Sequence, residues 1–150
     1  MKIAIGCDHA GLELKEVIVK ELEQLGIDVL DVGTHNCDSV DYPDYGKMVA
    51  QKVSGGDVQR GVLICGTGIG MSIVANKFKG VRAALCHDHN TAIMSRQHND
   101  SNIMVLGSRV ISKELAVEML HLWLDTPYEG GRHQQRLQKL KHIEDSTKHG

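Results

Sequence analysis

Short aliphatic runs alternate with amphipathic helical patterns along the whole chain, and this alternation limits the fold more than any other feature. Five runs have the length and apolar character of buried strands, at residues 2–5, 27–32, 60–64, 82–86 and 103–106. Strands that alternate with helices form a parallel sheet covered on both faces. We therefore predict one α/β domain over residues 1–150, with a five-stranded parallel sheet in a three-layer α/β/α arrangement.

The helices are predicted from apolar residues at helical spacing. The clearest lies at residues 12–25, and Gly26 follows it as helix-ending glycines do. Ser112 is a candidate N-cap for a later helix. Other helices are expected at residues 44–53, 68–76, 90–97 and 129–144, and residues 145–150 are expected to form a frayed tail.

Composition excludes several classes of protein. The 150 residues carry a formal net charge of −2 and only one tryptophan, three tyrosines and one phenylalanine, which disfavours nucleic-acid binding. No apolar run has the length of a membrane span or of a signal peptide. The four cysteines lack the spacing of a zinc site, so we expect reduced thiols in a cytoplasmic protein that does not bind membranes.

Polar and reactive residues follow the predicted strands. They are Cys7-Asp8-His9, Cys65-Gly66-Thr67-Gly68, His87-Asp88 and Ser108-Arg109. Parallel strands end at one edge of their sheet, and ligands bind there. The sequence therefore predicts a site at this edge.

The segment from Cys65 to Ser72 carries the strongest local signal. Gly66, Gly68 and Gly70 allow a tight turn at the start of a helix, where backbone N–H groups can hold an anion. A helix N-terminus also favours the thiolate form of a nearby cysteine, so Cys65 is a candidate base or nucleophile. Thr67 can bond a ligand oxygen, whereas Cys7 and Cys86 are expected to be packing residues.

Two other interpretations of this glycine loop stay open. It can be a turn that holds no ligand, or part of a dinucleotide site. The dinucleotide interpretation is weaker, because the spacing is G-x-G-x-G and the glycines follow the third strand.

Further candidates lie outside the loop. Asp8 and His9 are either a cap and a surface histidine or ligands of sugar hydroxyls. Arg132 and Arg136, four residues apart near a helix start, suit a phosphate, although a solvated basic face remains an alternative. The segment His87-Asp88-His89 is expected to be a solvated loop and not a metal site.

His98 follows a helix that returns from the carboxyl edge, so it should lie at the opposite edge of its own sheet. If His98 takes part in catalysis at the Cys65 site, the simplest geometry takes it from a second subunit.

Five motifs, in the same order along the chain, resemble those of type B ribose-5-phosphate isomerases. That family also contains galactose-6-phosphate isomerase subunits and some allose-6-phosphate isomerases. The resemblance extends to about residue 144. The motifs are Cys7-Asp8-His9-Ala10-Gly11, Asp41-Tyr42-Pro43, Cys65-Gly66-Thr67-Gly68-Ile69-Gly70-Met71-Ser72, Ser95-Arg96-Gln97-His98-Asn99-Asp100-Ser101-Asn102 and Gly130-Gly131-Arg132-His133.

The resemblance implies a Rossmann-like sheet and an enzyme that interconverts D-ribose 5-phosphate and D-ribulose 5-phosphate, a step of the pentose phosphate pathway. It implies no metal or organic cofactor, and a homodimer or dimer of dimers whose active sites are shared between subunits. A six-carbon sugar phosphate, allose 6-phosphate or galactose 6-phosphate, remains an alternative substrate. A nucleotide-dependent oxidoreductase and a non-catalytic sugar-phosphate sensor are the alternatives from other classes.

The resemblance also implies roles for individual residues. Cys65 corresponds to the base that moves a proton between C1 and C2. Members that lack this cysteine have a glutamate where Met71 stands, so this chain resembles the members that use cysteine. His98 corresponds to the residue that opens the sugar ring, with Thr67 assisting. Arg109, Arg132 and Arg136 match positions linked to phosphate binding. The other matched substrate contacts are Asp8, His9, Tyr42, Gly66, Gly68, Ile69, Gly70 and Asn99.

Overall fold

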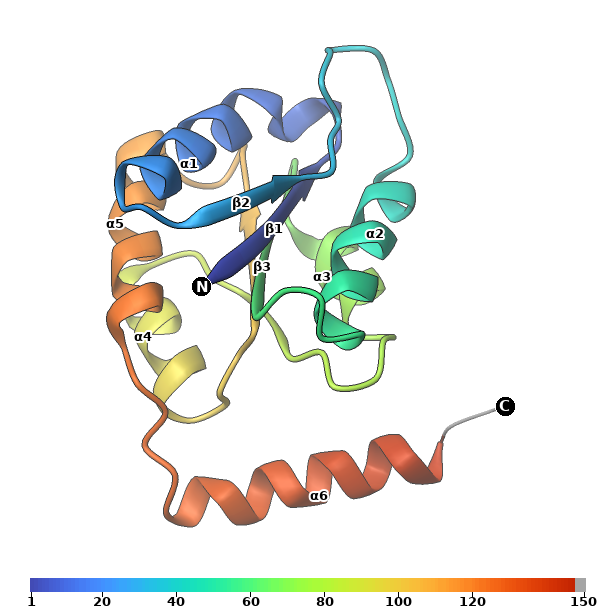
Figure 1. The fold of residues 1–150 in the computed structure, drawn as a ribbon, viewed down its shortest axis with the longest axis vertical. Coiled ribbons are helices and arrows are strands. Elements are labelled where there is room, and N and C mark those ends of the chain that lie inside the picture. The colour runs from blue at the N-terminus through green and yellow to red at the C-terminus, as the bar shows by residue number, and fades with distance from the viewer. Residues whose placement is uncertain (148–150) are drawn as a thin grey trace.

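Five parallel strands form the centre of the protein, in a computed structural model that describes residues 1–147 (Figure 1). The strand order is β2-β1-β3-β5-β4, and all four pairings are parallel. This confirms the predicted five-stranded parallel sheet. The strands are β1 (Lys2–Cys7), β2 (Asp28–Asp31), β3 (Arg60–Cys65), β4 (Ala83–Leu85) and β5 (Ile103–Gly107).

Helices cover both faces of the sheet. One face packs against α1 (Leu12–Gln24), α4 (His89–Gln97) and α5 (Lys113–Asp125), and the other packs against α2 (Tyr42–Ser54) and α3 (Ile69–Ala75). A short 3₁₀ turn, His9–Gly11, leads into α1. The last helix, α6 (Arg132–Ser146), extends away from both layers (Figure 1).

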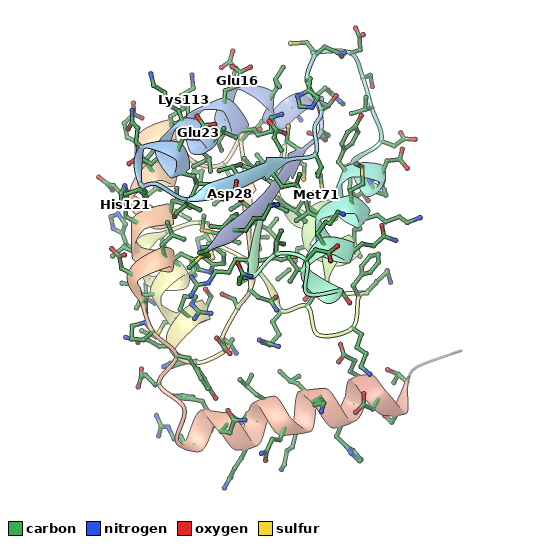
Figure 2. The ribbon with its side chains drawn as sticks, in the orientation of Figure 1. Glu16, Glu23, Asp28, Met71, Lys113 and His121 are labelled. Carbon is green, nitrogen blue, oxygen red and sulfur yellow. The ribbon has the colours of Figure 1, made fainter. Side chains whose placement is uncertain are left out.

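The core follows the alternation of side chains along the strands. In β1, Ile3 and Ile5 point toward α1 and α5, whereas Ala4 between them points toward α2. Trp123 of α5 and Met71 of α3 are both fully buried, one on each face. Figure 2 shows side chains filling the space on both sides of the sheet, while Glu16 and Glu23 lie on the outer side of α1. Both faces are therefore closed, as the apolar strands predict.

Two helix boundaries differ from the prediction for backbone reasons. Helix α2 begins at Tyr42 and not at residue 44, because Pro43 suits a first helical turn. Helix α6 begins at Arg132 and not at residue 129, because Gly130 and Gly131 have φ angles of 65° and 56°, which no α-helix accepts.

The prediction of a frayed tail from residue 145 was wrong for its first residues. Helix α6 continues to Ser146, whose hydroxyl bonds the carbonyl of Ile143 at 2.8 Å, and Thr147 forms its C-cap. Residues 148–150 lie outside the described part of the chain.

Helix α6 is joined to the rest of the protein mainly near its two ends. At the start, the ring of His133 stacks on His98, and near the end Glu144 accepts a hydrogen bond of 2.8 Å from the backbone of Gly80. Leu140 and Ile143, which lie between these two contacts along the helix, are 51% and 56% exposed. Within residues 1–147, no helix is both long enough and apolar enough to cross a membrane.

Candidate active site

The order of the strands places a topological switch point at the carboxyl ends of β1 and β3. From β1 the chain moves outward to β2 and then crosses back to β3 on the other side of β1. Such a reversal leaves a crevice at the carboxyl edge, where ligands of α/β proteins bind. Asp8 follows β1 here, and its backbone N–H bonds the carbonyl of Ile64, next to Cys65, at 3.3 Å.

Cys65 is the last residue of β3, and its sulfur faces the glycine loop. The thiol is 6% exposed, and the backbone N–H of Gly68 donates to its Sγ at 3.2 Å. The N–H of Ile69 donates to Oγ1 of Thr67 at 3.3 Å. Two N–H groups of the loop therefore bond side chains of the loop itself. The N–H groups of this loop were expected to hold an anion, and these two are already bonded within the loop.

Close contacts explain why glycine occupies the loop positions. A Cβ atom on Gly66 would lie 2.9 Å from the guanidinium of Arg109, and one on Gly70 would collide with the ring of Tyr42. Gly68 has a φ angle of 82°, in the region that favours glycine. The loop thus lies directly under an exposed arginine and an exposed tyrosine, both of them predicted site residues.

Asp8 and His9 are fixed beside the same crevice. The carboxylate of Asp8 accepts from the N–H of Ala10 at 3.0 Å, and Nδ1 of His9 accepts from the N–H of Val40 at 3.1 Å. Because Nδ1 acts as an acceptor, a neutral His9 ring carries its proton on Nε2. Asp8 therefore acts as a cap, and His9 bonds the backbone of a neighbouring loop. Nε2 of His9 is the atom that could contact a ligand.

The predicted site residues fall into two groups at opposite edges of the sheet. Residues 98–102 precede β5 at its amino end, where the N–H of Gly61 bonds the carbonyl of Asn102. Cys65 pairs with Gly107 at the far end of the same strands, about 13 Å along the sheet at 3.3 Å per residue. The group at the amino edge consists of His98, Asn99, Arg132 and Arg136. The group at the carboxyl edge consists of Asp8, His9, Tyr42, Cys65, Gly66, Thr67, Gly68, Ile69, Gly70 and Arg109.

At the amino edge, His98 belongs to a cluster that resembles a metal site in composition. Nitrogens of His98 and His133 and a carboxylate oxygen of Glu129 all lie within 4.8 Å of one another. However, the two rings stack with centroids 4.3 Å apart and planes 18° apart. Lone pairs of nearly parallel rings cannot point at one ion, so this arrangement does not fit a metal.

His133 is nearly buried in this cluster, and its pKa is lowered. Loss of solvent is the main cause, and the neighbouring His98 and Arg132 add to the effect. The ring is thereby held in its neutral form beside His98, which is partly exposed.

Two other cysteines behave as the sequence suggests. Burial raises the pKa of the Cys7 and Cys86 thiols to about 11 in each case. Both side chains belong to the core cluster beneath α1, α4 and α5. They remain neutral packing residues near pH 7.

The segment at residues 87–89 forms the start of α4. Asp88 is the N-cap, its carboxylate accepts from the N–H of Thr91 at 2.7 Å, and these hydrogen bonds lower its pKa. His89 pairs with Glu118 of α5 at 2.7 Å. All three residues of the segment are exposed, as predicted, but His89 is already the first residue of α4 and not part of a loop.

Sequence reasoning missed the buried Lys15. Its Nζ is bonded to Asp31 Oδ1 at 2.9 Å and to the carbonyl of Thr34 at 2.7 Å, which ties α1 to the loop before α2. Only its position beside the apolar stripe of α1 could have indicated burial. His133 was noticed only as part of a motif, and its helical spacing from Arg132 and Arg136 gave no sign that it faces His98.

Comparisons with known proteins define the class of this fold and site. The family profile for Ribose/Galactose Isomerase matches residues 3–140, which is most of the chain. The chain belongs to this isomerase family, and it is an enzyme of that class.

Individual relatives match over nearly their whole lengths. Ribose-5-phosphate isomerase B of Escherichia coli is 52% identical over 95% of this chain and 96% of its own. D-erythrulose-4-phosphate isomerase of Pectobacterium atrosepticum is 43% identical over 99% of both chains. The solved structure of Clostridium thermocellum ribose-5-phosphate isomerase B is 49% identical, with a TM-score of 0.97 over 99% of this chain and 100% of that chain.

Proposed function

We propose that this enzyme interconverts D-ribose 5-phosphate and D-ribulose 5-phosphate, with Cys65 as the base. The observation that carries the proposal is the position of Cys65 at the β1–β3 crevice, with the N–H of Gly68 directed at its sulfur. A hydrogen bond of this kind strengthens when the acceptor carries charge, as a thiolate does. The identity of 52% to the Escherichia coli enzyme supports the same reaction.

The chemistry begins with the closed ring of the substrate. An imidazole can pass protons near neutral pH, so His98 is assigned to ring opening, with Thr67 assisting. The Cys65 thiolate then takes the proton from C2, and a cis-enediolate forms. Transfer of the hydroxyl proton from O2 to O1 and return of the carbon-bound proton to C1 give the ketose. General-base transfer of this kind contributes about 10²–10⁴ in rate.

Substrate contacts are assigned from both groups of residues. Arg109 over the glycine loop, with Arg132 and Arg136, is proposed to hold the phosphate, which positions C2 against the sulfur. Contacts to the sugar are assigned to Asp8, His9, Tyr42, Gly66, Gly68, Ile69, Gly70 and Asn99.

The separation of the two groups supports a homodimer with shared sites, and a dimer of dimers would preserve the same arrangement. His98 and Cys65 of one chain lie at opposite edges of the sheet, so a histidine that serves Cys65 comes from a second copy. The exposed Leu140 and Ile143 on α6 give that copy apolar surface to cover. A groove of about 1330 Å³ between α6 and residues 76–84 offers further surface.

The Cys65→Ala variant tests the proposed base. We expect isomerisation of ribose 5-phosphate to be lost, by at least about 10²-fold in kcat, while the Kd for the substrate changes only a few-fold. The matched control is Cys37→Ser, which alters an exposed thiol that has no proposed role and should keep full activity. Full activity of Cys65→Ala would refute the assignment.

The choice of substrate needs its own assay. Initial rates on ribose 5-phosphate, allose 6-phosphate and galactose 6-phosphate at matched concentrations should show the highest kcat/KM for the pentose. D-erythrose 4-phosphate belongs in the same comparison, because one relative is a D-erythrulose-4-phosphate isomerase. A higher kcat/KM on a hexose phosphate would replace the proposed substrate and keep the mechanism.

A further inference from the structure

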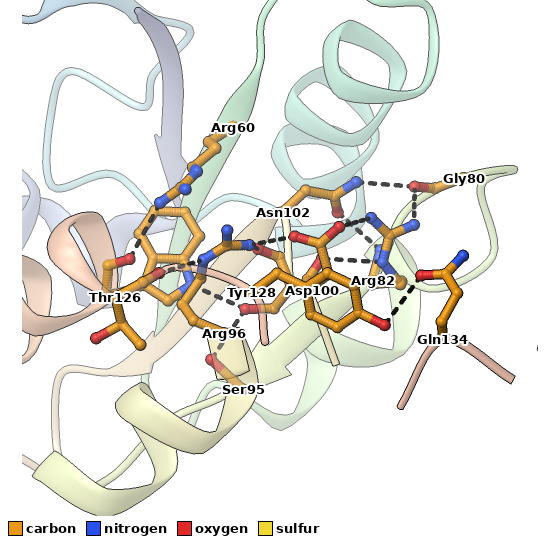
Figure 3. A network of polar contacts seen from close by, with 12 residues as sticks. Arg60, Gly80, Arg82, Ser95, Arg96, Asp100, Asn102, Thr126, Tyr128 and Gln134 are labelled. Carbon is orange, nitrogen blue, oxygen red and sulfur yellow. Dashed lines mark hydrogen bonds and ion pairs between the residues drawn. The ribbon is translucent and has the colours of Figure 1, made fainter. Parts of the chain in front are cut away.

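The buried guanidinium of Arg96 joins three separate parts of the amino edge (Figure 3). Its Nη1 donates to Asp100 Oδ1 at 2.8 Å and to the carbonyl of Ser101 at 2.6 Å, and its Nε donates to the carbonyl of Thr126 at 3.3 Å. The side chain is 6% exposed. A buried charge is expensive even when it is bonded, and apolar residues of similar volume often give equal stability. Stability alone therefore does not account for an arginine here.

The turn that carries His98 depends on the same contacts. Asp100 has a φ angle of 47°, an uncommon conformation that aspartate tolerates better than most residues. Its carboxylate lies between two guanidiniums, since Oδ2 is 3.5 Å from Nη2 of Arg82. Arg82 Nε also donates to the carbonyl of Asp100 at 2.9 Å (Figure 3). The two arginines thus hold the backbone that follows His98 in one conformation.

The start of α6 is attached to the end of α4 at three successive positions. Arg96 reaches Thr126, the carbonyl of Gln97 accepts from the N–H of Glu129 at 3.1 Å, and His98 stacks on His133. Residues 96–98 and the segment from 126 to 133 are therefore one unit. Arg132, adjacent to His133, is part of that unit, and Arg136 follows one turn later.

We propose that Arg96 is a positioning residue for the isomerase reaction. It fixes His98 relative to Arg132 and Arg136, so that the group that opens the ring and the groups that hold the phosphate reach the partner's Cys65 crevice at a set separation. This inference rests on the proposed function. It adds that the distance between His98 and the two arginines is set within one chain, by a side chain that does not contact the substrate.

The Arg96→Lys variant tests the proposal, because an ammonium keeps the charge but cannot reach three acceptors on two separate segments, residues 100–101 and Thr126. We expect kcat for ribose 5-phosphate to fall about 10- to 100-fold, as for a misplaced catalytic group, and KM to rise several-fold in the same variant. His98→Asn alone should lower mainly kcat, and Arg132→Ala alone should raise mainly KM.

Arg60→Lys is the matched control. Arg60 donates to the carbonyl of Trp123 at 3.0 Å and lies 4.9 Å over that ring, in the same region, but it bonds neither the His98 turn nor the segment before α6. This variant should lower Tm and keep both kinetic constants. Equal kinetic losses in Arg60→Lys and Arg96→Lys would reduce Arg96 to a purely structural residue and overturn the proposal.

A double variant shows whether Arg96 acts through His98. If it does, Arg96→Lys combined with His98→Asn should have the same kcat as His98→Asn alone, since there is no histidine left to position. Losses that multiply would contradict the proposal. If Arg96→Lys does not fold, Asp100→Asn is used in its place, because it weakens the same contact and keeps the guanidinium bonded to two carbonyls.

Two results distinguish a failure of this inference from a failure of the proposed function. Wild-type kcat in His98→Asn would refute the role of His98 in ring opening. A low kcat in His98→Asn together with wild-type constants in Arg96→Lys would refute the positioning role alone.

Discussion

At the scale of single residues, the contact between Gly70 and Tyr42 joins two segments that are distant in sequence. The tyrosine ring occupies the space that any side chain at position 70 would need. Gly70 lies in the first turn of α3 and has no unusual φ angle, so the packing and not the backbone requires glycine. The tyrosine lies over the loop only as long as position 70 has no Cβ.

We expect Gly70→Ala to displace Tyr42 and to raise KM for ribose 5-phosphate about tenfold, which corresponds to about 1.4 kcal/mol of binding. Thermal unfolding should change little, because alanine favours helix more than glycine does. Steady-state kinetics and a melting curve test both statements. The control is Gly55→Ala at the end of α2, outside the crevice. An unchanged KM in Gly70→Ala would remove Tyr42 from the substrate site.

Residues also show what sequence reasoning could and could not supply. Cys65, Gly66 and Arg109 lie at or just after the carboxyl ends of strands, so the rule for carboxyl edges predicts from the sequence that they lie together. The burial of Lys15 depends on Asp31 and on the carbonyl of Thr34, which become neighbours only when β2 pairs with β1. No local pattern encodes such a contact.

At the scale of elements, we expect the stability of the α6 attachment to depend on the protonation of His133. Its folded-state pKa is lowered, so between that value and the unfolded value of about 6.5 the unfolded chain binds more protons. The stability that this residue contributes is therefore present above about pH 6.5 and is lost as the pH falls through the folded-state pKa.

The free energy of unfolding should thus decrease from pH 7.5 to pH 5.5 more steeply in the wild type than in His133→Asn, as measured by urea titration. His142→Asn provides the control, since it alters another histidine of α6 that lies exposed. Identical pH dependence in the wild type and His133→Asn would contradict the expected contribution.

The boundaries of elements were predicted less well than their order. Helix α6 was expected to start at residue 129, but two successive positive φ angles make Gly130 and Gly131 a linker. Helix α2 starts at Tyr42 because Asp41 and Pro43 suit an N-terminus. In both cases backbone dihedral angles determine where the helix begins, and the spacing of apolar residues carries no information about these angles.

At the scale of the whole molecule, the proposed shared site requires two protomers, because its two groups of residues lie at opposite edges of one chain's sheet. This can be tested with a heterodimer of one Cys65→Ala chain and one His98→Asn chain, purified by two different tags. One of its two sites would combine an intact Cys65 with an intact His98, so we expect about half of the wild-type activity.

Each variant purified alone should have a strongly reduced kcat, and that comparison is the control for the mixed species. A heterodimer no more active than its parents would place both residues in one chain's site or refute one of the roles. An assembly with shared sites, unlike the sheet, could be predicted from the sequence only through the position of His98 after a returning helix and through the resemblance to the isomerase family.

The attachment of α6 at both ends also limits which insertions and deletions the helix can accept. His133 and Glu144 meet fixed partners, and about 16 Å of helix separates them at 1.5 Å per residue. Losing or gaining one codon between them would rotate Glu144 by about 100° away from Gly80. This stretch can therefore accept replacements at its exposed positions, but a single-residue insertion or deletion would detach one end of the helix.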